Sequence, residues 1–98
     1  MLLSMSANAS NIQGTVISVW AHNMSNHFLW EMDKPLGSCS TFATNRDRYV
    51  VDISTNKGRM IASTILAAYA SKQRVNVGGT GTCAEWTDSE SVNWVGMY

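Results

Sequence analysis

The sequence has few charged residues, little proline and little cysteine. Of its 98 residues 14% are charged, and seven basic residues cancel seven acidic ones. Phosphate backbones and anionic lipid surfaces attract clusters of Lys and Arg, so a neutral chain argues against nucleic acid as a partner. No run approaches the ~18 apolar residues of a membrane span, so membrane insertion is not expected. With 45% hydrophobic residues, the chain has the composition of one globular domain.

The first nine residues are similar to the end of a secretory signal peptide. Leu2, Leu3 and Met5 are apolar, and Ala7 to Ala9 have the small-x-small pattern of a cleavage site. A basic start is missing, so a chance similarity is the alternative. We expect residues 1–9 to be a signal remnant, residues 10–98 to form a single domain, and the protein to be secreted or periplasmic.

The two cysteines, Cys39 and Cys83, lie far apart in the chain. In an exported protein such a pair most simply forms one disulfide, which in the chain-entropy model stabilises the fold by roughly 4 kcal/mol. The alternatives are two buried free thiols or half of a metal site. Because the chain has no CxxC motif and only two histidines, we expect the disulfide, and we expect neither a metal nor a cofactor.

One segment has a clear helical period. Ile61, Ile65, Ala68 and Tyr69 recur at helical spacing and predict one apolar stripe on a helix of about four turns. Each of the residues Ser54 to Asn56, just before this helix, is a possible N-cap. We therefore predict a helix with one face in the core.

The other apolar segments are short, rich in β-branched and aromatic residues, and separated by turn-prone polar stretches. With one helix they give the order β-β-β-α-β-β, which is the order of the OB-fold, a Greek-key barrel. We expect a mainly β protein with an OB-fold-like five-stranded barrel. The predicted strands are Gly14–Ala21, His27–Met32, Tyr49–Ile53, Arg74–Val77 and Asn93–Tyr98, with the helix after the third and a glycine turn at residues 78–81.

The helix and the strand after it carry a family resemblance. The segment GRMIASTILAAYASKQRVNVGGTGTC, with the later VNWV, resembles the B subunits of AB5 toxins, in particular the subtilase-cytotoxin B-like and pertussis-like subunits. The likeness covers Gly14 to Tyr98, and its specific part is the helix-strand-cysteine unit. It implies an OB-fold, a ring-shaped homopentamer with the helices around its centre, binding to cell-surface glycans, and a possible catalytic A subunit as partner.

The residues themselves give no pattern typical of an enzyme. His22 and His27 flank the first hairpin loop, without the nucleophile and orienting acid that a catalytic histidine needs. The glycines at 78–81 precede no helix and lack the Lys-Ser/Thr ending of a phosphate-binding loop. We therefore predict a non-catalytic protein.

The aromatic and amide residues favour carbohydrate binding, because sugars present apolar C–H faces beside hydroxyl groups. We expect Trp20 and Trp94, inside strands, to lie in the core or an interface. The alternative for every tryptophan is burial in the core, and Asn-rich hairpins are often only turns. The candidate glycan-binding residues are Trp86 and Asp88 in the last loop, and Trp30, Asn23, Asn26 and His27 in the first hairpin.

The last strand predicts self-association. It carries no charge from Val92 to the end of the chain, although an unpaired sheet edge normally needs charge or cover. In a ring this strand would pair with the next subunit. The alternative to a glycan-binding oligomer is a structural or protein-binding oligomer with no sugar ligand.

Overall fold

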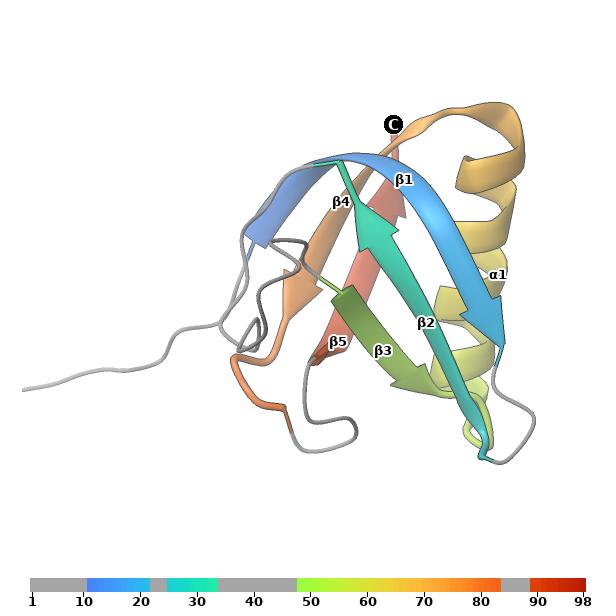
Figure 1. The fold of residues 1–98 in the computed structure, drawn as a ribbon, viewed down its shortest axis with the longest axis vertical. Coiled ribbons are helices and arrows are strands. Elements are labelled where there is room, and N and C mark those ends of the chain that lie inside the picture. Colours follow the sequence, from blue (N-terminus) through green and yellow to red (C-terminus); the bar gives the residue numbers. More distant parts are fainter. Residues whose placement is uncertain (1–10, 22–24, 34–47, 84–88) are drawn as a thin grey trace, which may run out of the picture.

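The computed structural model describes residues 11–21, 25–33, 48–83 and 89–98, and the statements below concern these residues (Figure 1). The predicted signal remnant, residues 1–9, lies outside them. The described elements are β1 (Asn11–Ala21), β2 (His27–Met32), β3 (Arg48–Asp52), α1 (Asn56–Ser71), β4 (Arg74–Gly79) and β5 (Ser89–Met97).

The five strands hydrogen-bond in a closed ring in the order β1-β2-β3-β5-β4. Only β3 and β5 are parallel, and each of the other pairs is antiparallel. The predicted mainly β fold, with its OB-like element order and closure, is therefore confirmed. Three strands are longer than predicted, since β1 begins at Asn11, β4 ends at Gly79 and β5 begins at Ser89.

β1 pairs with two neighbouring strands, and a β-bulge at Ile17 lies close to the point where it changes partner. Thr15 and the residues before it pair with β4, whereas Ser18 and the residues after it pair with β2. The extra residue also changes which side chains face inward, because a strand alternates with a period of two. Ile12 and Val16 are buried before the bulge, and Val19 packs against the core after it.

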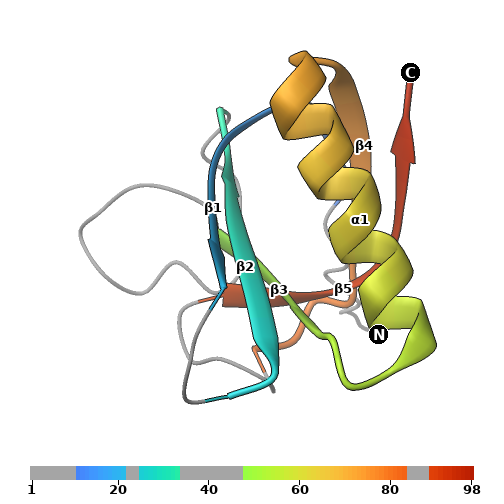
Figure 2. The same cartoon turned by 90° about the vertical axis from the view of Figure 1, so that its right-hand side faces the viewer.

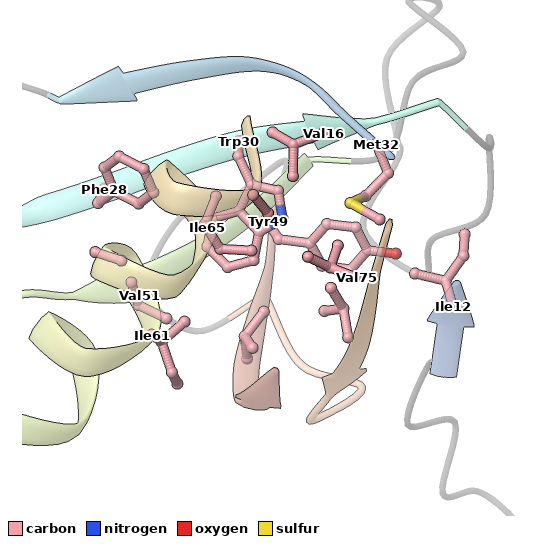
Figure 3. Packing of buried hydrophobic residues seen from close by; sticks show 14 residues of the cluster. Ile12, Val16, Phe28, Trp30, Met32, Tyr49, Val51, Ile61, Ile65 and Val75 are labelled. Atoms are coloured by element: carbon pink, nitrogen blue, oxygen red, sulfur yellow. The ribbon is translucent and has the colours of Figure 1, made fainter. Parts of the chain in front are cut away.

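The core lies between the ring of strands and the buried face of α1. Trp30 and Tyr49 are completely buried, and their ring centroids are 5.8 Å apart (Figure 3). Phe28 lies on the other side of Trp30 with a centroid separation of 5.9 Å. Ile65 of α1 reaches the same group of rings (Figure 3). Aromatic pairs at this separation contribute about 0.5–1.5 kcal/mol beyond their buried area.

The helix begins where the sequence predicts. Thr55 is its N-cap, and its hydroxyl accepts a hydrogen bond from the Gly58 backbone N–H at 2.9 Å. A side chain at Gly58 would collide with the Asp52 carbonyl oxygen, so glycine is needed for this close approach. Ile65 is buried as predicted, but Tyr69 is largely exposed at the edge of the stripe.

The predicted glycine turn is partly wrong. Gly78 and Gly79 are the last residues of β4, and each leaves room for a side chain of β5. A Cβ on Gly78 would meet the Trp94 indole, and one on Gly79 would meet the Glu90 carboxylate. The turn begins only at Thr80. Residues 89–91, which precede the predicted last strand, are buried strand because they pair with β3. The Glu90 carboxylate accepts a hydrogen bond from the Gly81 N–H at 2.8 Å.

Cys83 is disulfide-bonded. The chain has one other cysteine, Cys39, which lies outside the described residues. The predicted Cys39–Cys83 pairing therefore stays a prediction.

Candidate functional site

Trp30 cannot bind a glycan. Its side chain has 0% exposed surface and stacks between Phe28 and Tyr49, so the prediction of an exposed platform at this position is wrong. The physical reason is the parity of β2: Phe28, Trp30 and Met32 all point into the core, where a tryptophan fills the most space.

The other candidates in the first hairpin lie at its open end. Asn26 is exposed, and its carbonyl oxygen accepts a hydrogen bond from the Ile53 N–H at 2.8 Å, which ties the hairpin to the end of β3. His27 pairs with Asp52 in the register of β2 and β3. The predicted residues Asn23, Trp86 and Asp88 lie outside the described part of the chain, so their roles stay predictions.

Two strand tryptophans, predicted to lie in the core or an interface, are exposed in the single chain, and the interface position stays a prediction. Trp20 is 41% exposed, with the Arg48 guanidinium 5.4 Å from its ring centroid, and Trp94 is 45% exposed. A core position is therefore excluded for both. The sequence signal for Trp94 is the glycine across from it, because an aromatic side chain on one strand often covers a glycine on the next.

Trp94 of β5 and Tyr98, the residue that follows β5, form an exposed aromatic face. Both point away from the core, since Val95 between them packs inward. Tyr98 is 54% exposed, and the Arg74 guanidinium lies 5.7 Å from its ring centroid. Gly96 lies midway between the two rings, and an added Cβ there would have no neighbour within 4 Å. The two aromatic residues are about 13 Å apart along the strand, with an open floor between them.

Amide side chains border this floor. Asn76 of β4 pairs with Gly96, and Gln13 of β1 pairs with Asn76, so the three residues form one row across the sheet. The Asn76 Oδ1 atom is buried and has no hydrogen-bond partner. A buried acceptor without a partner is unfavourable, so rotation of the Asn76 side chain toward a ligand hydroxyl would gain free energy. We call Trp94, Gly96, Tyr98 and Asn76 the aromatic face.

Two cavities follow the groove between α1 and β5. The first, with a volume of about 290 Å³, lies at the N-terminal end of α1 and has several residues with polar side chains in its lining; we call it the polar cavity. The second, of about 430 Å³, contains Met60 and Trp94 and is called the apolar cavity. Both are lined by Lys57 and Asn93, so the two cavities are neighbours along the groove.

A β-bulge places Asn93 at the junction of the cavities. Val92 pairs with Gly79 and Trp94 pairs with Gly78, which leaves Asn93 as the extra residue of β5. Bulges redirect side chains and occur often next to functional sites. The amide of Asn93 is thus exposed where the polar and apolar cavities meet.

Asp52 is the acidic group of the polar cavity. Its Oδ1 accepts hydrogen bonds from the Ser54 hydroxyl at 2.7 Å and the Ser54 N–H at 2.8 Å. These bonds lower the pKa of Asp52 below its ordinary value, with a smaller contribution from His27. Because Ser54 donates its hydroxyl proton to a carboxylate, it is not arranged as a nucleophile activated by an imidazole.

The second half of β5 has a free edge. β3 pairs only with Ser89, Glu90 and Ser91, so in the described structure no strand pairs with that side of β5 beyond Ser91. The Tyr98 N–H donates to the Arg74 carbonyl at 3.0 Å, and antiparallel pairs alternate in their bonding. The backbone groups of Met97 therefore point toward the free edge, which forms a margin of the molecule beside α1 (Figure 2).

The described residues define a small mainly β protein with a closed ring of strands and one helix. They contain no cluster of side chains suited to a metal ion, and no helix among them has the length and apolar character needed to cross a membrane. Comparison of the chain with protein-family models, curated proteins and solved structures finds no match.

Proposed function

We propose that this protein is a secreted, non-catalytic glycan-binding subunit that assembles into a ring-shaped oligomer, as the B subunits of AB5 toxins do. The observation that carries the proposal is the aromatic face. It offers two exposed rings, Trp94 and Tyr98, with an open glycine floor and amide hydrogen-bonding groups between them. This combination suits a sugar, whose ring has apolar faces and a hydroxyl rim.

The charge of the face favours a sugar over a nucleic acid. Arg74 is the one charged side chain in the rows that carry Trp94 and Tyr98, and the chain has no net charge. Binding to a phosphate backbone normally requires several Lys and Arg side chains along a groove. The Arg74 guanidinium also lies against the Tyr98 ring, where it helps to hold the ring in place.

The free edge of β5 supports assembly into an oligomer. An uncharged edge with unpaired backbone groups is a template for another strand. A ring requires that two different surfaces of the same chain meet head to tail, and a pentamer is the ring size that the resemblance implies. A catalytic A subunit remains part of the proposal as the partner of such a ring. Export is supported by the disulfide at Cys83.

The same edge favours a second candidate function, a structural or protein-binding oligomer without a sugar ligand. An edge strand binds extended peptides through its backbone alone, with no need for the aromatic face. The two functions predict different results for a substitution of Trp94. A glycan-binding protein should lose sugar binding, whereas assembly through the free edge should be unchanged, because the Trp94 side chain points away from the core and takes no part in the edge.

A glycan array probed with the purified full chain tests the proposal. We expect binding to at least one glycan class, reduced tenfold or more in Trp94→Ala and in Tyr98→Ala. Trp20→Ala is the matched control, since Trp20 is equally exposed but lies on β1 beside β2. The Trp86→Ala variant tests the predicted role of Trp86 in the same assay. Binding to no glycan on the array would reject the proposed function and leave the protein-binding oligomer.

A further inference from the structure

The polar cavity contains a hydroxyl group that lacks a partner. Ser91 is only 8% exposed, and its Oγ atom is buried without a hydrogen bond. The backbone of Ser91 is fully used, because its carbonyl accepts from Thr80 at 2.8 Å and its N–H donates to Thr82 at 3.0 Å. Burying an unpaired hydroxyl is unfavourable, and Ser91 lines the cavity, so rotation of its side chain toward a ligand there would give the hydroxyl a partner.

Some of the other polar groups of this cavity already form hydrogen bonds within the protein, and the others are available to a ligand. The Thr55 hydroxyl donates to the Asp52 carbonyl at 3.0 Å and accepts from Gly58, and Thr80 shares its hydroxyl with Thr82 at 2.8 Å. Asp52 receives both Ser54 bonds on Oδ1, which leaves Oδ2 to accept from a ligand. The exposed side chains of Lys57 and Asn93 add donors at the rim.

We propose that the polar cavity binds one terminal, uncharged hexose unit of a glycan whose next sugars lie along the groove toward Trp94. The inference rests on the proposed function and specifies its ligand. Vicinal hydroxyls of the hexose donate to the Asp52 carboxylate and accept from Lys57 and Asn93. A further hydroxyl meets the Ser91 Oγ atom.

The size and charge of the cavity select this ligand class. A volume of about 290 Å³ is at the lower end of small-molecule sites, which suits a single sugar ring. Lys57 and Asp52 bring one charge of each sign, so the lining is neutral. An acidic sugar would bring its carboxylate close to the ionised Asp52, and two like charges at short range repel. We therefore expect neutral termini to be preferred over sialylated ones.

The arrangement of the groove connects the hexose to the aromatic residue. Asn93 and Lys57 line both cavities, and Trp94 lines the second. A short oligosaccharide can thus place its terminal ring in the polar cavity and a following ring against Trp94. The bulge lies on this path, because Asn93 is the extra residue of β5 and lines both cavities.

The test compares paired glycans on one array, with galactose-, glucose- or mannose-terminated chains beside their sialylated forms at equal density. The variants are Asn93→Ala, Ser91→Val and Asp52→Asn. Asp33→Asn is the matched control: Asp33 binds Thr15 through both its carboxylate oxygens and lines neither cavity. We expect the three cavity variants to lose at least tenfold of the binding to neutral termini, while Asp33→Asn keeps it. Thermal melts check that each variant is folded. If Ser91→Val or Asp52→Asn unfolds, the test depends on Asn93→Ala, because Asn93 is exposed and its substitution should leave the fold intact.

The outcomes separate the two proposals. Glycan binding that Trp94→Ala abolishes but Asn93→Ala and Asp52→Asn leave unchanged overturns the cavity assignment and keeps the proposed function. Binding only to sialylated termini overturns the neutral ligand class. No glycan binding by the wild-type chain rejects both. A second readout uses the free monosaccharides as probes: we expect the backbone amide resonances of Ser91 and Asn93 to shift with galactose, glucose or mannose, and no shift with any of the three contradicts the assignment.

Discussion

The two halves of β5 contrast sharply. Ser89 to Ser91 are paired with β3, buried, and form what we call the closed side, together with Trp30 and Tyr49. From Asn93 to Tyr98 the strand is paired only with β4, and its side chains are half-buried or exposed; this is the open side. One strand thus belongs to the core at its start and to a surface with unused aromatic and backbone groups at its end.

The contrast shows how a chain of this size divides its residues between stability and binding. The closed side contains the large buried side chains that stabilise the fold. The open side retains an exposed Trp94, a free edge and the apolar cavity, and the polar cavity lies where the two sides meet, between Ser91 and Asn93. Substitutions on the closed side are therefore expected to change stability, and substitutions on the open side to change binding or assembly.

The largest expected effect is the difference in stability between alanine substitutions of two tryptophans, one on the closed side and one on the open side. Trp30→Ala removes a fully buried ring and should lower the free energy of unfolding by about 3–5 kcal/mol. Trp94→Ala, on the open side, should lower it by less than about 1 kcal/mol. Denaturant titrations of both variants measure this difference. Equal destabilisation would show that Trp94 belongs to the core and would remove the contrast.

Glu90 on the closed side should rank second. Glu90→Ala leaves the Gly81 N–H without its acceptor and should cost roughly 2–3 kcal/mol of stability. The control Glu90→Gln keeps the volume and one carbonyl acceptor, so it should cost less than the alanine variant. The denaturant midpoint at constant slope is the measurement. A Glu90→Ala variant as stable as the wild type would show that the hydrogen bond from Gly81 to Glu90 does not stabilise the fold.

On the open side, Met97→Pro should dissociate the oligomer. Proline removes an N–H that points to the free edge and donates to no strand of the described chain, so the fold should survive. Gly96→Pro is the contrasting control, because the Gly96 N–H lies on the β4 side. Sedimentation velocity should show an oligomer for the wild type and a monomer for Met97→Pro. A wild-type chain that is monomeric at micromolar concentration would reject the assembly.

The smallest expected effect concerns pH. The Ser54 bonds lower the pKa of Asp52, so their contribution to stability is present above the pKa of the unfolded chain and is lost as pH falls through the folded one. Ser54→Ala should raise the pKa of Asp52 and reduce stability at pH 7. The difference between Ser54→Ala and the wild type should vanish at strongly acidic pH. A carboxylate NMR titration gives the pKa directly. An unchanged pKa of Asp52 in Ser54→Ala would contradict the Ser54 hydroxyl as a cause of the lowered pKa.

Much of the fold could be predicted because its signals are local. The helical stripe of Ile61, Ile65 and Ala68, the N-cap at Thr55 and the alternation of Val75 with polar neighbours each depend on residues a few positions apart. The element order then restricts the topology to few choices. These features do not require knowledge of which strands are neighbours.

The site was harder to predict because exposure in a strand depends on its partners. The sequence gives Trp30 and Trp94 the same surroundings of strand-forming residues, yet one fills the core and the other covers Gly78. Bulges at Ile17 and Asn93 shift the inward parity within β1 and β5, and no local pattern marks them. The paired glycines at 78 and 79 are the available signal, but a glycine pair is also typical of a turn.

The most direct test of the central claim, that the outward side chains on the open side of β5 bind the glycan and are dispensable for the fold, is a graded series at Gly96. An added side chain there meets no neighbour within 4 Å, so Gly96→Ala and Gly96→Val should fold with stability within about 1 kcal/mol of the wild type. On the glycan array, binding should fall with the size of the side chain and should drop at least tenfold in Gly96→Val. Full binding by a folded Gly96→Val variant would contradict the account.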